Sequence, residues 1–171
     1  MSDDVSEVSA RVADGLLHAG RVGRPHGLDG SFHVGQPTPQ LLTLGASVRI
    51  DGRDTEVVRR AGTDERPILR LALAAERDAI EALRGHELLV PRGAAPQLQD
   101  GEYWADDLEG CTVVAGEREL GAVARLVALP SCEALELEGG LLVPMVGDAV
   151  MRIDVSTRRI EVDAAFLGVQ A

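Results

Sequence analysis

The sequence predicts an all-β protein built from two small barrel-type domains. Short segments alternate apolar and polar residues with the period of a strand, and glycine-containing turns separate them at regular intervals. Hydrophobic residues make up 45% of the chain and aromatic residues only 2%, so we expect cores of Val, Leu, Ile and Ala. A loop rich in Pro, Gly and Ala at 93–100 predicts a linker between one domain at 15–92 and another at 101–165.

The first domain is predicted to be a closed sheet crossed by one short helix. In its second strand Phe32 and Val34 point inward, while Ser31 and His33 face water. Asp51-Gly52 is a strong signal for a two-residue hairpin turn. The strands expected in this domain are 16–24, 31–34, 48–50, 56–60, 67–73 and 86–90.

The helix of the first domain is predicted at 74–84. Ala79, Ile80 and Leu83 fall on one side of it. Gly85 follows at the position where glycine commonly ends a helix.

The second domain repeats the pattern of short strands. Gly139-Gly140 predicts a hairpin, and Ile160 and Val162 point inward in the last strand. Many short strands with regular turns indicate a barrel or a sandwich. The strands expected here are 111–114, 120–129, 135–138, 141–145, 150–153 and 159–163.

Both ends of the chain are predicted to be tails. Residues 1–14 are rich in Ser, Asp and Glu without a sustained period, which is typical of a disordered segment. Residues 166–171 form a C-terminal tail that Phe166 is expected to anchor.

The charge of the chain is unevenly distributed. The formal net charge is -11 and the pI is about 4.7. Residues 1–95 hold 12 Arg and 14 Asp or Glu, a balance of -2, whereas residues 96–171 hold 5 Arg and 14 Asp or Glu, a balance of -9. Because an acidic protein repels polyanions at long range, its natural electrostatic partner is a basic protein.

The residues suited to catalysis or metal binding lack the spacing of known sites. Ser31, His26 and Asp29 suggest a triad, but no nucleophile elbow is present and turn chemistry explains them better. A zinc site made of His26, His33 and a cysteine matches no standard ligand pattern. We therefore predict no catalytic residue, no metal and no cofactor. The alternative is a small barrel enzyme or ligand-binding protein that uses the His26 loop.

The chain is expected to act in the cytoplasm. The N-terminus is acidic and polar, and no apolar run approaches the length of a membrane span. Cys111 and Cys132 have no CxxC spacing, so we expect reduced thiols. We predict a monomer that binds no membrane.

The chain's only Tyr and only Trp are adjacent, at Tyr103 and Trp104. Exposed Tyr and Trp are typical anchors of protein interfaces, and Asp106 and Asp107 add negative charge beside them. We predict that these four residues bind a protein. Two alternatives remain open: the rings fill the gap between the domains, and the carboxylates form a solvated face or a helix N-terminus.

Two stretches resemble the ribosome maturation factor RimM family. Residues 20–32, GRVGRPHGLDGSF, resemble the family's opening motif, and residues 101–111, GEYWADDLEGC, resemble the start of its PRC-barrel domain. Residues 142–144, 150–154 and 159–163 are similar to the end of that domain.

The resemblance implies a fold and a function. The fold is a β-barrel of the kind found in translation proteins, followed by a PRC β-barrel. The function is that of a non-enzymatic assembly factor, which binds the small-subunit ribosomal protein numbered nineteen. It would act on the immature 30S subunit, in maturation of the subunit head and processing of 16S rRNA. The family's adjacent aromatic pair falls on Tyr103 and Trp104.

Arg21, Arg24 and His26 lie beside the glycine-rich turn of the first motif. They are candidates for contact with the rRNA backbone. The alternative is that they are exposed loop residues that contact only solvent. The sequence departs from the family pattern at Asp29, where the family often carries a basic residue, and at Ser31, where it often carries a carboxylate. Asp29 weakens the expectation that this loop grips phosphate. A third departure, Ala105 in place of an aromatic residue, narrows the aromatic patch.

Overall fold

The computed structural model describes Arg11 and residues 14–169. These residues form two compact units, one within Ala13–Gln99 and the other made of Asp100–Ala171 together with Arg11. Strands dominate both units, which confirms the predicted all-β class. The disordered tail predicted at 1–14 lies outside the described residues, apart from Arg11 and Asp14.

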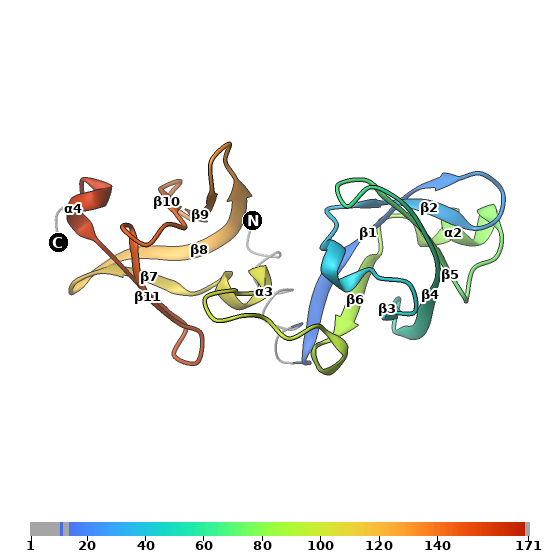
Figure 1. Ribbon diagram of the computed structural model, residues 1–171, viewed down its shortest axis with the longest axis horizontal. Helices are drawn as coiled ribbons and strands as arrows, with labels where there is room; N and C mark the ends of the chain where they lie inside the picture. Colours follow the sequence, from blue (N-terminus) through green and yellow to red (C-terminus); the bar gives the residue numbers. More distant parts are fainter. Residues whose placement is uncertain (1–10, 12–13, 170–171) are drawn as a thin grey trace. The chain divides into compact units, whose positions relative to one another are not determined.

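The first unit is a closed six-stranded barrel (Figure 1). Its neighbouring strands follow the order β1-β2-β5-β4-β3-β6, and β6 pairs with β1 to close the ring. Its ladders are antiparallel. The strands are β1 (Leu16–His26), β2 (Ser31–Gly35), β3 (Ser47–Ile50), β4 (Arg53–Gly62), β5 (Pro67–Leu71) and β6 (Glu87–Pro91).

The barrel forms because apolar side chains alternate along its strands. Phe32 in β2 and Leu69 in β5 are fully buried and stand opposite each other in the ladder. The predicted inward direction of Phe32 and Val34 is therefore confirmed. Further aliphatic side chains of the strands contribute to the core: Leu17, Ala19, Val22, Val48, Ile50, Val57, Leu71, Leu88 and Val90.

One helix, α2 (Arg77–Leu83), packs against β1 and β2, as predicted for this domain (Figure 1). It buries Ile80 and Leu83, whereas Ala79 is exposed. The helix begins three residues later than expected, and the segment before it passes close to the β1–β2 loop. A Cβ atom on Gly30, which has a φ of +79°, would lie 2.2 Å from the carbonyl oxygen of Ala74. Two 3-10 turns, η1 (Pro39–Leu41) and η2 (Arg92–Ala94), complete the unit.

The second unit is a six-stranded sheet in the order β10-β9-β8-β7-β12-β11. The pairing of β12 with β7 is parallel, and the other ladders are antiparallel. The strands are β7 (Thr112–Ala115), β8 (Arg118–Ala128), β9 (Glu133–Leu137), β10 (Leu142–Pro144), β11 (Val150–Asp154) and β12 (Arg159–Val162). Their core is aliphatic apart from one thiol: Leu108, Cys111, Val113, Ala115, Val123, Leu135, Leu137, Val143, Ile160 and Val162.

The second unit also contains two short helices, and the first of them agrees with the alternative that Asp106 and Asp107 lie at a helix N-terminus. The first is α3 (Ala105–Leu108) and the second is α4 (Ala164–Leu167). Asp163 caps α4 by accepting a hydrogen bond of 2.8 Å from the backbone N–H of Phe166. This turn directs Leu167 toward the core and leaves Phe166 51% exposed. The expectation that Phe166 anchors the tail is therefore wrong.

Candidate binding surfaces

The aromatic pair stands at the start of α3 in the second unit. Trp104 has an extended backbone and precedes the helix as its N-cap residue, and its carbonyl oxygen accepts a hydrogen bond from the N–H of Asp107. Both rings are half-buried. Tyr103 packs against the core of the second unit. The pair is thus held by the fold while part of each ring stays accessible.

Asp106 does not share that accessibility. Its side chain is 7% exposed, and its Oδ1 lies 3.5 Å from the guanidinium Nη2 of Arg11, which is 10% exposed. A buried carboxylate beside a buried cation is a structural contact rather than a docking charge. Asp107 is half-buried, and its carbonyl oxygen accepts a hydrogen bond of 3.2 Å from the Cys111 Sγ.

The segment that carries the aromatic pair and α3 is also held in place at its C-terminal end. Gly110 donates to the carbonyl oxygen of Val123, and Arg158 donates to the carbonyl oxygen of Glu109 at 2.9 Å. Gly110 has a φ of +76°, a left-handed backbone conformation that favours glycine at this position. Cys111 is fully buried, and the burial raises the pKa of its thiol. An uncharged, buried thiol is a core residue rather than a nucleophile.

The surface of the second unit is acidic because carboxylates outnumber arginines there, and several of the arginines are paired with carboxylates. Arg125 pairs with Glu136 at 2.6 Å, and Arg159 approaches Glu161 at 3.8 Å. Further carboxylates are exposed on the same unit: Asp100, Glu102, Glu117, Glu119, Glu133, Glu138 and Asp148. The excess of -9 therefore appears as negative surface.

In the first unit the three predicted RNA-contact residues separate into two groups. Arg21 donates to Glu87 at 3.0 Å and to the carbonyl oxygen of Gly85 at 3.3 Å, so its guanidinium is held by the barrel. Arg24 and His26 are exposed near the end of β1. The ring of His26 stands edge-on to the ring of His33, with centroids 5.1 Å apart.

Two further arginines of the first unit, one on β4 and one on β5, were not singled out from the sequence. Arg59 and Arg70 are paired residues of β4 and β5, so both side chains lie on one face of the sheet. Arg70 lies between the buried Leu69 and Leu71, which places that face outside the barrel. Strand alternation already predicts an outward Arg70, but it does not reveal which strands lie beside β5.

Asp29 forms ion pairs with both Arg59 and Arg70. Its Oδ2 lies 2.8 Å from Arg59 and 3.7 Å from Arg70, and its Oδ1 accepts a hydrogen bond from the backbone N–H of Ser31 at 3.1 Å. Hydrogen bonds from Ser31, followed by the positive charge of Arg59, lower the pKa of Asp29. The carboxylate is therefore fully ionised at neutral pH.

Ser31 does not face water, contrary to the prediction. It is 1% exposed because Asp29 and Arg59 cover it, and its hydroxyl lies 3.3 Å from the Arg59 guanidinium. The hydroxyl is enclosed by these partners, and the ring of His26 contacts His33 instead. This arrangement does not support a Ser31-His26-Asp29 catalytic set.

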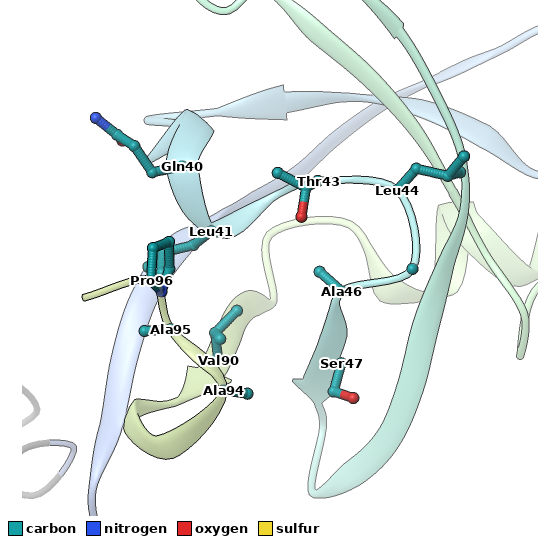
Figure 2. A pocket seen from close by; sticks show the side chains of 11 residues that line it. Gln40, Leu41, Thr43, Leu44, Ala46, Ser47, Val90, Ala94, Ala95 and Pro96 are labelled. Carbon is teal, nitrogen blue, oxygen red and sulfur yellow. The ribbon is translucent and has the colours of Figure 1, made fainter. Parts of the chain in front are cut away.

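A separate depression of about 410 Å³ opens in the first unit between the η1–β3 loop, the end of β6 and η2. Figure 2 shows Leu44 and Thr43 on the loop, with Val90 and Ala94 on the opposite wall. None of its lining residues is charged, a histidine or a cysteine. The depression therefore offers no general acid or base for the enzyme alternative.

Neither a metal cluster nor a membrane-spanning helix occurs in the described part of the chain. Arg11 and residues 14–169 contain no group of His, Cys, Asp and Glu side chains placed to hold a metal ion. No helix within the same residues has the length and apolar character needed to cross a membrane.

Comparison with known proteins identifies the family. The model of the RimM PRC barrel domain matches residues 105–165. A ribosome maturation factor RimM from Symbiobacterium thermophilum is 34% identical over 158 residues, which cover 86% of this chain and 91% of that protein. The chain belongs to the ribosome maturation factor RimM family.

Two further RimM proteins are similar to the chain. The RimM of Sorangium cellulosum is 32% identical over 152 residues, covering 82% of this chain and 89% of that protein. A solution structure of the N-terminal domain of RimM from Thermus thermophilus is 24% identical, covers 49% of this chain and 98% of that one, and has a TM-score of 0.42. The family match and the identities to whole relatives confirm the predicted RimM resemblance and the predicted PRC domain.

Proposed function

We propose that this RimM-family chain is a non-enzymatic assembly factor for the small ribosomal subunit. It binds the small-subunit ribosomal protein numbered nineteen and promotes maturation of the 30S subunit head and processing of 16S rRNA. The names of its relatives support the ribosomal role, since proteins 32% and 34% identical to it are called ribosome maturation factors. We further propose that it works as a monomer in the cytoplasm.

The observation that carries the proposed protein contact is the adjacent aromatic pair on an acidic unit. Tyr103 and Trp104 are held in place at α3, and both keep accessible ring surface. Partly exposed aromatic anchors often dominate the binding energy of an interface. The surrounding negative charge attracts a basic ribosomal protein and speeds the encounter.

The proposed docking surface consists of Tyr103, Trp104 and Asp107. Asp106 was predicted to bind the partner as well, but because it is buried beside Arg11 we propose that it supports the stretch instead. Arg24 and His26 are proposed to contact the 16S rRNA backbone. Arg21 is less suited to that contact because it is held both by Glu87, whose side chain is only 20% exposed, and by the carbonyl oxygen of Gly85.

Titration calorimetry with the purified ribosomal protein tests the docking surface. Trp104→Ala and Tyr103→Ala should each weaken binding by about 2 kcal/mol, or roughly thirtyfold, as hot-spot residues do. Phe166→Ala is the matched control, because it removes an exposed aromatic ring from the same unit. Thermal unfolding of each variant establishes that the fold is intact. Wild-type affinity in both test variants would reject the aromatic pair as the docking site.

A further inference from the structure

The first unit concentrates positive charge on one face although its total charge is balanced. Residues 13–99 hold 11 Arg and 11 Asp or Glu. Arg59 and Arg70 lie on the outer face of β4 and β5, and Arg24 and His26 are exposed on β1. The strand order β1-β2-β5-β4 makes these strands consecutive neighbours in the barrel.

Further groups lie beside this cationic face, around the β1–β2 loop. Arg77 donates to the carbonyl oxygen of Gly27 at 3.2 Å, which brings a guanidinium from α2 to the loop. His33 contacts the ring of His26 from the neighbouring strand. Burial, and after it the positive charges of Arg24 and His26, lower the pKa of His33. Arg24, His26 and His33 therefore form one cluster on β1 and β2, and Arg77 reaches the loop that joins these two strands.

Asp29 sits among these cations and satisfies two of them. The carboxylate bridges Arg59 and Arg70, and the three side chains remain 49%, 37% and 41% exposed for Arg59, Arg70 and Asp29. Ion pairs as exposed as these are weak, so an incoming anion can displace the carboxylate. Arg59 and Arg70 thus form an anion site in which the Asp29 carboxylate is the bound anion.

We propose that the outer face of β1, β2, β5 and β4 binds the phosphodiester backbone of RNA, with Arg59 and Arg70 as phosphate ligands and Asp29 as a competing internal anion. The planar guanidinium groups match phosphate oxygens in a bidentate manner. The proposal deepens the rRNA contact of the proposed function, and it rests on that function for the choice of RNA.

The histidine rings favour RNA over an acidic protein as the ligand. His26 is exposed on β1, and His33 stands beside it on β2. Unpaired RNA bases stack on aromatic rings and on arginine planes, and a strand face that carries both is a common platform for single-stranded RNA. An acidic peptide has no base to stack there.

Fluorescence anisotropy with a short labelled single-stranded RNA and the full-length chain tests this site. Asp29→Asn keeps the oxygen that accepts from Ser31 but removes the charge, and it should tighten RNA binding by about three- to fivefold. Arg59→Gln and Arg70→Gln should weaken binding. Each should also reduce the slope of log affinity against log salt by about 0.7, as expected for one lost phosphate contact to a single strand.

The Arg49–Asp54 ion pair supplies matched controls. It is also exposed, also 2.8 Å long and in the same barrel, but it joins β3 to β4. Asp54→Asn and Arg49→Gln make the same charge changes and should leave affinity within about twofold of wild type, because salt screens distant charges. Equal effects of Asp54→Asn and Asp29→Asn would overturn the proposal, as would an unchanged salt slope in Arg59→Gln and Arg70→Gln.

Two further arms distinguish RNA binding at this face from binding of acidic protein and from docking at the aromatic pair. In one arm poly-glutamate replaces RNA as the ligand. If Asp29→Asn, Arg59→Gln and Arg70→Gln alter the binding of poly-glutamate and leave that of RNA unchanged, the face binds acidic protein and the proposal fails. In the other arm the Tyr103→Ala/Trp104→Ala double variant should bind RNA as wild type does. Failure of protein docking at the aromatic pair would therefore leave the RNA result intact, and the reverse also holds.

Discussion

The two units each contain six strands in the described part of the chain, but they acquire their surface charge differently. In the second unit acidity follows from composition, since residues 96–171 carry an excess of -9. In the first unit composition is nearly neutral, and strand order segregates the charges instead. Arg59 and Arg70 meet Asp29 only because β4, β5 and the β1–β2 loop are brought together. An acidic surface can therefore be read from a sequence more readily than a local cationic face.

The interiors differ as well. The first unit closes its barrel around Phe32, which is fully buried. The core of the second unit is made of aliphatic residues and Cys111, with Tyr103 packed against it from the surface. The chain's single Trp lies in the second unit, so its fluorescence reports on that unit separately from circular dichroism, which reports on both.

The largest effect on stability is expected from a substitution in the core of the first unit. Phe32→Ala removes a fully buried ring and should lower the free energy of unfolding by about 3–5 kcal/mol. Denaturant unfolding followed by circular dichroism measures this loss. The Trp104 fluorescence transition should move much less, because the substitution lies in the other unit. Phe166→Ala is the control and should change stability by less than about 1 kcal/mol.

A common shift of both signals in Phe32→Ala would contradict the separation of the units. It would mean that they unfold as one cooperative block, and the comparison between two independent cores would no longer hold.

A smaller effect is expected at the aromatic stretch of the second unit. Arg11→Ala leaves the buried Asp106 carboxylate without this cation, and it should cost about 1–3 kcal/mol of unfolding free energy. Denaturation followed by Trp104 fluorescence measures it. Arg125→Ala removes the exposed partner of Glu136 and should cost less than about 1 kcal/mol. If the two substitutions prove equally mild, Asp106 is not a supporting residue.

The smallest effect compares one carboxylate from each unit. Hydrogen bonds from Ser31, then the charge of Arg59, lower the pKa of Asp29, and hydrogen bonds from Ser156 and Thr157 lower the pKa of Asp154. A folded-state pKa below the unfolded one contributes stability at pH values above the unfolded pKa. That contribution is lost as the pH falls through the folded pKa.

Carbon NMR titration of the carboxyl groups measures these two pKa values. Both carboxylates should titrate below the ordinary Asp value of 3.8. Ser156→Ala should raise the pKa of Asp154 and leave that of Asp29 unchanged, so each unit serves as the control for the other. Ordinary titration of both groups would show that these hydrogen bonds are weaker in solution.

Local features of the fold were predictable from local sequence. Asp51 and Gly52 both have positive φ at the tip of the β3–β4 hairpin, as the pattern predicts, and Gly85 has a φ of +87° just after α2. Strand alternation placed Phe32 and Val34 in the core. These signals succeed because a turn or a pleat depends on residues adjacent in the chain.

The candidate site was predicted less completely. Tyr103 and Trp104 stand out as the chain's only Tyr and Trp. No pattern in the neighbouring sequence predicts that Asp106 is buried against Arg11. That contact joins residues nearly a hundred positions apart. Ser31 was expected to face water for the same reason: its cover comes from Arg59, on a strand that sequence alone does not place beside it.

The sequence by itself determined the all-β class, the RimM family and the acidity of the second unit, because each follows from local patterning, matching motifs or a count of charges. The tertiary structure decided which charges remain at the surface and which meet across strands. It buried Asp106, tied Arg21 to Glu87 and set Asp29 between Arg59 and Arg70. The physical reason is that electrostatic partners are chosen by distance in space, which strand order sets.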